Sequence, residues 1–213
     1  MPNHVKNELY FECGNKERIS DLMNTIKGED TLFDFNKVIP MPKELDIESG
    51  SRGDNGYEAY RDYINTGIKP QEIIDEFGKT RTVDADGLAL GKKYFENIVK
   101  FGYKTWYGWR IEHWGTKWNA YDDAELHNGV SFLTAWNAPF TVISKLSEMF
   151  PDVRIIHYFA DEDIGMNCGR YFFVNGEPVE DADYIKEGTE EAIKFACDLW
   201  GLDYDEYLGE SET

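Results

Sequence analysis

The sequence has few cysteines and no long apolar run, and both absences narrow the class of protein. Its three cysteines stand far apart, at positions 13, 168 and 197, and this spacing fits neither a disulfide framework nor a zinc finger. No segment approaches the roughly 18 consecutive apolar residues of a membrane helix. The segment from Met1 to Glu8 is polar, whereas a secretory signal is basic and then apolar. We therefore expect a cytoplasmic protein with reduced, mostly buried thiols.

Positive charge is also scarce. The chain has 41 Asp and Glu against 22 Lys and Arg, a formal net charge of −19. Residues 177–213 contain 13 acidic residues and two lysines, a net charge of −11, which leaves −8 for residues 1–176. A field of this sign repels phosphate backbones, so direct binding of nucleic acid is disfavoured. Hydrophobic residues at 41% and aromatic residues at 15% supply a packed core and exclude a disordered chain.

Familiar catalytic signatures are missing as well. The sequence has no G-x-S-x-G, no H-E-x-x-H and no glycine-rich phosphate loop. Asp161, Glu162 and Asp163, near His157, lack the ligand spacing of a calcium loop, so we interpret them as a solvated turn. These absences make an enzyme less expected without excluding one, because catalytic groups converge in space. The sequence predicts no metal site and no cofactor.

Hydrophobic periodicity predicts the order of the elements. Alternation over residues 5–13 predicts a strand, and apolar residues at helical spacing between Asn15 and Gly28 predict a helix. Residues 46–57 are rich in Gly, Ser and Asp, which is typical of a loop. Further strands are expected at 33–38, 130–135, 153–159 and 170–174, and further helices around 60–64, 73–77, 88–99, 139–149 and 189–200.

Two β-α-β units separated by a helical insertion are typical of the split β-α-β, ferredoxin-like arrangement. The predicted fold class is therefore α+β, with an antiparallel sheet, a helical insertion at about 46–104 and an acidic C-terminal helix. We expect a ferredoxin-like domain over residues 1–176 and an acidic extension over residues 177–213 packed on it. A doubly wound parallel sheet is disfavoured because the turn after the first strand, at Cys13 and Gly14, is no phosphate loop.

Several stretches resemble one known family. They are MPNHVKNEL at the start, FDFNKVIPMPKEL at 33–45, WRIEHWGTKWNA at 109–120, VSFLTAWNAP at 130–139 and the region of Gly165, Asn167 and Gly169. Together, over about residues 1–176, they resemble the YubB-type ferredoxin-like domain family of phage, prophage and plasmid proteins. The resemblance implies the ferredoxin-like fold and an origin on a mobile genetic element, and it implies no catalytic residues.

The densest chemistry of the sequence lies in residues 105–122. Four of the six tryptophans occur here, interleaved with cations, and such a composition suits the stacking of a base, the holding of a peptide or the clamping of a phosphate. The alternative is that these rings fill the joint between the insertion and the sheet, because large aromatic residues are usually buried. The candidate binding residues are Trp109, Arg110, His113, Trp114, Lys117, Trp118 and Asn119.

The charge and the resemblance favour a non-enzymatic accessory protein of a mobile genetic element. Carboxylates placed where phosphates would lie attract a basic surface, as in a nucleic-acid mimic or an anti-defence protein. We therefore expect a host protein with a basic surface as the partner, and no membrane. The acidic candidates for this contact are Glu180, Asp181, Asp183, Glu187, Glu190 and Glu191.

Two other hypotheses stay open. One is a small enzyme or ligand-binding module that acts on nucleotides or nucleic acid through residues 105–122, with His113 or Asp122 as an acid or base. RNA-recognition modules share the topology, but the strand that carries Phe132 and Trp136 lacks their signature. The other hypothesis is an interaction module that forms a homodimer through its aromatic surface. The oligomeric state does not follow from the sequence.

Overall fold

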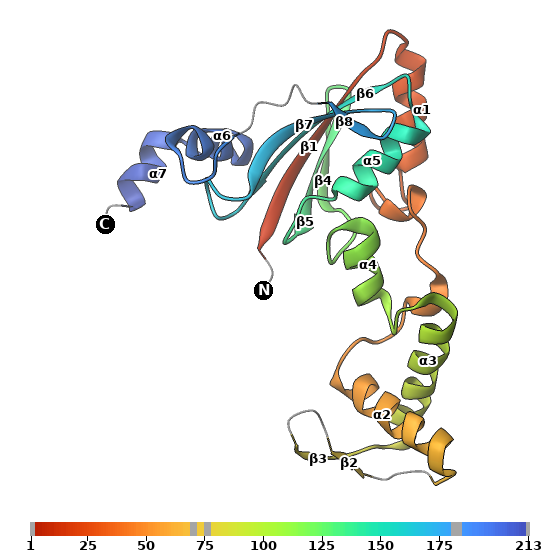
Figure 1. Cartoon of the computed structure of the whole chain (residues 1–213). Coiled ribbons are helices and arrows are strands. Elements are labelled where there is room, and N and C mark those ends of the chain that lie inside the picture. The colour runs from red at the N-terminus through yellow and green to blue at the C-terminus, as the bar shows by residue number, and fades with distance from the viewer. Residues whose placement is uncertain (1–2, 69–71, 75–77, 180–184, 212–213) are drawn as a thin grey trace. The chain divides into compact units, whose positions relative to one another are not determined.

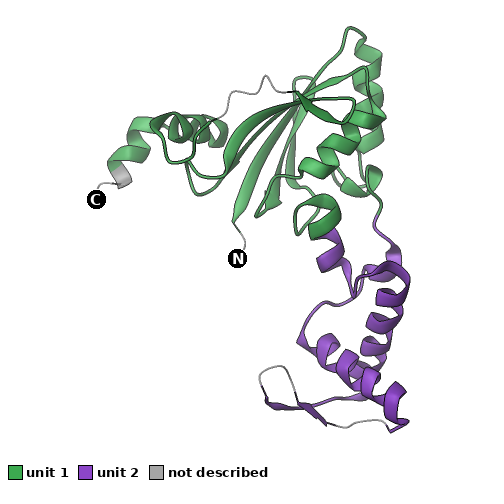
Figure 2. Ribbon diagram, viewed as in Figure 1, with its two compact units in different colours: residues 1–40, 111–213 green, residues 41–110 purple. Residues whose placement is uncertain are grey.

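The computed structural model describes residues 3–68, 72–74, 78–179 and 185–211 (Figure 1). Its contacts divide the chain into two compact units (Figure 2). Unit 1 comprises residues 1–40 and 111–213, and unit 2 comprises residues 41–110. The insertion expected at about 46–104 falls within unit 2. No helix of the described part combines the length and the apolar character needed to cross a bilayer.

A six-stranded antiparallel sheet forms the centre of unit 1, with the strand order β4-β5-β1-β6-β7-β8. Both β5 and β6 run antiparallel to β1, so the helix that connects them crosses over the strand between them. This is the split β-α-β arrangement, and it confirms the predicted α+β, ferredoxin-like fold. The strands are β1 (His4–Glu12), β4 (Tyr121–Leu126), β5 (Gly129–Ala135), β6 (Arg154–Asp161), β7 (Cys168–Val174) and β8 (Glu177–Val179).

Helices α1 (Lys16–Ile26) and α5 (Phe140–Met149) lie on one side of this sheet (Figure 1). Helix α1 begins where predicted, because the Asn15 side chain accepts a hydrogen bond from the first turn at 3.0 Å. Phe140 of α5 packs on Val5 of β1. These contacts bury every second residue of β1, and the residues between them point to the opposite face.

Helix α6 (Glu190–Trp200) packs on the opposite face, and α7 (Tyr204–Ser211) follows it. The alanines on one side of α6 pack against Ala160 of β6 and Cys168 of β7. In the strand register Ala160 lies beside Lys6, which belongs to the outward set of β1. We call this side of the sheet the α6 face.

Unit 2 is built on two helices that touch at glycines. A Cβ on Gly56 would lie 1.8 Å from the Gly87 carbonyl oxygen, and a Cβ on Gly91 would lie 1.9 Å from the carbonyl carbon of Gly56. Only glycine allows so close an approach of two backbones. The elements of unit 2 are η2 (Lys43–Leu45), α2 (Ser51–Thr66), β2 (Glu72–Ile74), β3 (Thr80–Thr82) and α3 (Ala85–Phe101).

The prediction of a strand at 33–38 is wrong. The chain forms a short 3-10 helix there, η1 (Phe35–Lys37), and the Asp34 carboxylate accepts a hydrogen bond from a backbone amide two residues on, at 3.0 Å. Phe33 and Phe35 are fully buried and pack edge-on, with 5.0 Å between ring centroids. Alternate residues can also be buried in a turn that is capped by its own side chain. The apolar pattern of residues 33–38 therefore resembles that of a strand, although the segment belongs to no sheet.

Two predictions inside unit 2 are also wrong. The loop expected at 46–57 contains the start of α2 at Ser51, because its glycines serve helix packing. The helix expected at 73–77 is replaced by β2, in which Ile73 is buried and pairs with Arg81 of β3; Phe77 lies outside the described residues. Helix α4 (Trp106–Trp114) and strand β4 were not predicted.

All three cysteines are free thiols, as predicted. Cys168 and Cys197 are buried, whereas Cys13 is half-buried. Burial raises the pKa of the Cys168 and Cys197 thiols. Both therefore stay protonated and act as small apolar side chains between α6 and its surroundings.

Candidate functional site

The aromatic segment at residues 105–122 forms helix α4 and the loop that leads into β4. The boundary between the two units falls inside α4, after Arg110. The predicted set is thus divided between the units. Trp109 and Arg110 belong to unit 2, and unit 1 contains His113, Trp114, Lys117, Trp118 and Asn119.

In unit 2, Trp109 is buried and Arg110 is mostly buried. The Arg110 guanidinium lies 4.9 Å from the centroid of the Trp106 ring and 3.8 Å from the Asp46 carboxylate. A ring and a carboxylate together hold a guanidinium in place. Arg110 therefore makes its printed contacts within unit 2, and Trp109 is a buried residue of the same unit.

In unit 1, Trp114 and Asn119 bind the segment that precedes unit 2. Trp114 is fully buried, its indole donates a hydrogen bond to the Ile39 carbonyl at 3.0 Å, and its ring is edge-on to Phe35 at 5.6 Å. The Asn119 Oδ1 accepts a hydrogen bond from the Phe35 amide at 2.8 Å, and its Nδ2 donates to Asp34 at 2.7 Å. These two side chains tie the η1 segment to the rest of unit 1.

Lys117 lies between two tryptophans of unit 1. Its ammonium is 5.1 Å from the centroid of Trp118 and 5.0 Å from that of Trp136. Trp118 is edge-on to Tyr121 at 5.9 Å, and the Tyr121 hydroxyl lies 2.6 Å from Nδ1 of His4. Burial raises the pKa of Tyr121 to about 12. We call these residues the Lys117 cluster; its members His4, Tyr121 and Trp136 were not predicted binding residues.

The candidate acid and base of the enzyme hypothesis lie on different elements. His113 is half-buried in the last turn of α4, and Asp122 is exposed on β4. Asp122 has a φ of 50°, in the left-handed region that aspartate tolerates better than most residues. This conformation coincides with the register shift between β4 and β5, so it is explained by a bulge in an edge strand.

The acidic turn at 161–163 is only partly solvated. Asp161 is buried and accepts hydrogen bonds from Asn3 at 3.1 Å and from Asn167 at 3.2 Å. Glu162 and Asp163 are exposed. The prediction of a solvated turn is thus right for the last two residues and wrong for Asp161. Within the described ranges no three His, Cys, Asp or Glu side chains gather as a metal site would require.

Half of the acidic candidates can be placed, since Glu180, Asp181 and Asp183 lie outside the described residues. The Glu187 carboxylate accepts a hydrogen bond from the Asn167 amide at 3.1 Å. Glu190 pairs with Lys194 at 2.6 Å, and the hydrogen bond from this lysine lowers the pKa of the Glu190 carboxyl. Glu191 is exposed in the first turn of α6. The three described candidates therefore surround the start of α6.

The negative charge is not shared equally between the two units. Unit 2 has 12 acidic and 11 basic residues, a net charge of −1, which leaves 29 acidic and 11 basic residues, a net charge of −18, for unit 1. Together the two counts cover all 213 residues. Nearly all of the excess therefore belongs to the ferredoxin-like unit.

A groove lies on the α6 face of unit 1, between α6 and strands β1 and β6. Its volume is about 530 Å³, within the range of ligand pockets. In the strand register Glu8 is beside Tyr158 and Tyr10 is beside Ile156, so both pairs point to this face. We call it the α6 groove. It is lined by Glu8, Tyr10, Glu12, Ile156, Tyr158, Phe195, Asp198 and Leu199.

Three of the five polar side chains that line the α6 groove are carboxylates, and the other two are tyrosines. The Tyr10 hydroxyl donates a hydrogen bond to Glu8 Oε2 at 2.8 Å. Burial and, to a smaller extent, the hydrogen bond to Glu8 raise the pKa of Tyr10 to about 12. This phenol therefore stays neutral and acts as the donor in the bond. Asp198 is exposed at the edge of the groove. None of the lining residues is basic.

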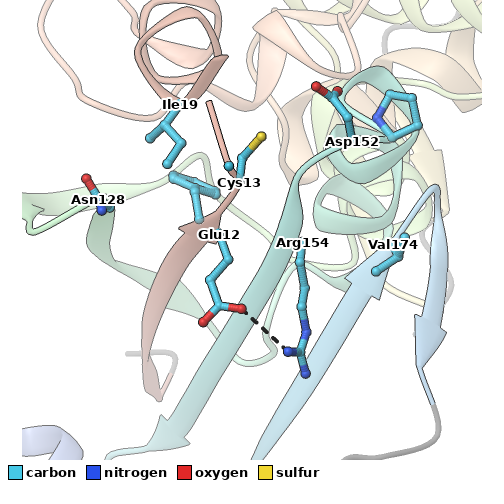
Figure 3. Close-up of a pocket in the computed structure, with 10 residues that line it drawn as sticks. Glu12, Cys13, Ile19, Asn128, Asp152, Arg154 and Val174 are labelled. Carbon is cyan, nitrogen blue, oxygen red and sulfur yellow. Dashed lines mark hydrogen bonds and ion pairs between the residues drawn. The ribbon is translucent and has the colours of Figure 1, made fainter. Parts of the chain in front are cut away.

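A second cavity, of about 620 Å³, lies where β1 ends (Figure 3). Figure 3 shows the Glu12 carboxylate directed at Arg154, with 3.4 Å between the paired atoms. The Cys13 thiol and the Asp152 carboxylate lie on other sides of the same cavity. Both carboxylates of this cavity are paired, Glu12 with Arg154 and Asp152 with Arg18. The cavity therefore has less preference for a cation than the α6 groove has.

Comparisons with known proteins identify a domain. Residues 113–203 match a family model described as the ferredoxin-like domain in Api92-like protein. The chain is also similar to a solved structure, the protein api92 from Yersinia pseudotuberculosis, at 11% sequence identity and a TM-score of 0.43, over 89% of this chain and 100% of that chain. No curated protein matches the chain. Residues 113–203 are therefore similar to the ferredoxin-like domain of Api92-like proteins.

Proposed function

We propose that this chain is a non-enzymatic accessory protein of a mobile genetic element, and that it binds a basic host macromolecule in the cytoplasm. The observation that carries the proposal is the segregation of charge, with −18 on unit 1 and −1 on unit 2. Such a field accelerates encounters with a cationic partner and repels polyanions. The resemblance to phage, prophage and plasmid proteins supports the mobile-element origin.

Many of the exposed carboxylates of unit 1 belong to α6, α7 and the residues next to these helices. An acidic array of this kind competes for the same basic surfaces that bind phosphate backbones, so the proposed mode of action is that of a nucleic-acid mimic. Seven exposed carboxylates belong to this segment: Glu187, Glu190, Glu191, Asp198, Asp203, Asp205 and Glu206.

Affinity capture from a host lysate tests the proposal. The wild-type chain is compared at about 50 mM and about 500 mM salt with a variant of unit 1, Glu191→Gln/Asp205→Asn/Glu206→Gln. A matched variant of unit 2, Glu48→Gln/Asp62→Asn/Glu72→Gln, loses the same charge from exposed positions. We expect basic proteins that are released by high salt and by added duplex DNA, and that are retained less by the unit 1 variant only. Retention of partners that are neither basic nor salt-sensitive would contradict the proposal.

The Lys117 cluster supports a second candidate function, a ligand-binding module for nucleotides. The observation in its favour is the ammonium between two half-buried indoles, since indole faces stack bases and an ammonium binds phosphate. A thermal-shift screen with nucleotides and divalent cations tests it, because a ligand of the native state raises the melting temperature by mass action. A shift that disappears in Lys117→Met would support this function, and the absence of any shift would refute it.

A further inference from the structure

We infer that the α6 groove binds the side chain of an arginine presented by the basic partner. The inference rests on the proposed function and adds two points to it: where on unit 1 the contact is made, and which side chain is recognised. It depends on the shape, the rings and the charge of one cavity.

The aromatic lining of the groove suits a planar cation on an aliphatic stem. Tyr158 of β6 and Phe195 of α6 stack, with 6.2 Å between centroids and 29° between planes. Tyr10 of β1 meets Tyr158 edge-on at 5.9 Å. Three rings from three elements thus form one continuous wall. The methylene groups of an arginine pack on such a wall, and its guanidinium stacks on ring faces.

The carboxylates of the groove supply the acceptors that a guanidinium needs. Tyr10 occupies Oε2 of Glu8, and a carboxylate has further lone pairs to offer. Asp198 belongs to α6, whereas Glu8 belongs to β1, and among the described residues no group donates a hydrogen bond to the Asp198 carboxylate. A guanidinium has five N–H donors, which is enough to bond to more than one carboxylate. Charge complementarity therefore selects a cationic occupant.

The same face already holds a guanidinium in this manner. The Arg154 guanidinium lies 4.2 Å from the centroid of Phe172, and its Nη1 is 3.4 Å from Oε2 of Glu12. Both a ring and a carboxylate contact it. Because Arg154 is paired with Glu12, the groove recognises an incoming cation mainly through Glu8 and Asp198. A lysine ammonium is strongly hydrated and does not stack, so it binds less well than arginine.

Nuclear magnetic resonance on the full-length chain labelled with ¹⁵N tests the inference. The probes are the N-acetyl amides of arginine, lysine and glutamine, each titrated separately. We expect the arginine probe to shift amides of the lining residues on β1, β6 and α6, the lysine probe to bind at least about threefold more weakly, and the glutamine probe to cause no shift. Shifts spread over unit 1 without a cluster, or equal binding of the arginine and lysine probes, would overturn the inference.

A matched pair of variants separates the groove from the general charge. Glu8→Gln/Asp198→Asn should weaken binding of the arginine probe about tenfold, since two charge-assisted acceptors are lost. Glu17→Gln/Asp21→Asn removes the same charge from exposed positions on α1, on the other side of the sheet, and should change the affinity less than about twofold. Unchanged binding in the groove variant would refute the inference.

The capture experiment distinguishes the failure of this inference from that of the proposed function. If the groove variant still retains basic proteins in a salt-dependent manner while the arginine probe does not bind, the groove assignment is wrong and the proposed function stands. If the probe binds in the groove but the wild-type chain retains no basic protein, the proposed function is wrong and the groove is a binding site for free guanidinium compounds.

Discussion

Acid should destabilise the protein through one buried histidine, His157 of β6. Its Nε2 is 2.9 Å from Oδ1 of Asn7, whose Nδ2 donates to the Thr134 hydroxyl at 2.9 Å. This network makes Nε2–H the donor and leaves Nδ1 as an acceptor. Among the described residues Nδ1 has no hydrogen-bond partner, and the rings of Phe140 and Phe159 pack around the imidazole at 5.5 and 5.3 Å. Protonation would bury an unpaired charge.

The size of the effect follows from the two protonation equilibria. Burial lowers the pKa of His157 from its ordinary value of 6.5 to about 3. The unfolded chain therefore binds a proton that the native chain does not, and stability is fully present above pH 6.5 and is lost as the pH falls towards 3. At pH 5 the unfolded imidazole is protonated and the native one is still neutral. Between pH 7 and pH 5 this single group should cost about 2 kcal/mol of unfolding free energy.

Urea unfolding at pH 7 and pH 5 measures this loss in the wild-type chain and in His157→Gln. The glutamine amide can still donate to Asn7 but does not titrate, so the variant should lose about 2 kcal/mol less between the two pH values. His157→Phe serves if the glutamine variant does not fold. His127→Gln, at an exposed turn, is the control and should behave as the wild type. Equal losses in the wild type and in both His157 variants would refute the reasoning.

Two further predictions concern packing. Gly91→Ala should destabilise unit 2 by about 1–3 kcal/mol, because the new Cβ would enter the backbone of α2. The control, Gly108→Ala, should be tolerated, because the atom nearest to its new Cβ is 3.5 Å away. Equal unfolding curves for the two variants would contradict the glycine contact. Trp114→Ala should lower the free energy of unfolding, measured in urea, by about 3–5 kcal/mol. The control is Trp106→Ala, at a half-buried site. If Trp114→Ala lowers the free energy of unfolding no more than the control does, Trp114 is not a core residue.

The fold could be predicted from the sequence wherever one face of an element was buried. The strand at 5–13 and the helix after Asn15 have regular periods because their apolar residues meet the same core. The segment at 33–38 failed since Phe33 and Phe35 are buried by tertiary contacts, with no ladder behind the alternation. Strand β4 escaped prediction because it lies at an edge and has few buried side chains.

Glycines misled the prediction of unit 2. A run with Gly50, Gly53 and Gly56 has the composition of a loop, and local propensity places glycine outside helices. In the structure the last two face α3, where a Cβ on Gly53 would lie 2.3 Å from the ring of Tyr94. Whether a glycine ends a helix or allows a neighbour to approach depends on the neighbour. That information is in the contact between α2 and α3 and not in the sequence of α2.

The acidic surface shows the same division between what is local and what is not. A count of charges located the excess near the C-terminus, and this count needs no structure. The α6 groove combines Glu8 and Tyr10 from the first strand with Phe195 and Asp198 from the helix of the acidic segment, and more than 180 positions separate them in the sequence. One signal was available: Lys6, Glu8, Tyr10 and Glu12 are the outward set of an alternating strand. This set predicts a polar, aromatic strip on the sheet, but only the packing of α6 against β6 turns the strip into a groove with two walls.

A carboxylate in that groove is held beside rings that a cation can stack on, whereas the other carboxylates of α6 and α7 act through charge. For this reason the strength of binding should depend on the whole of unit 1, and the choice of side chain should depend on the groove.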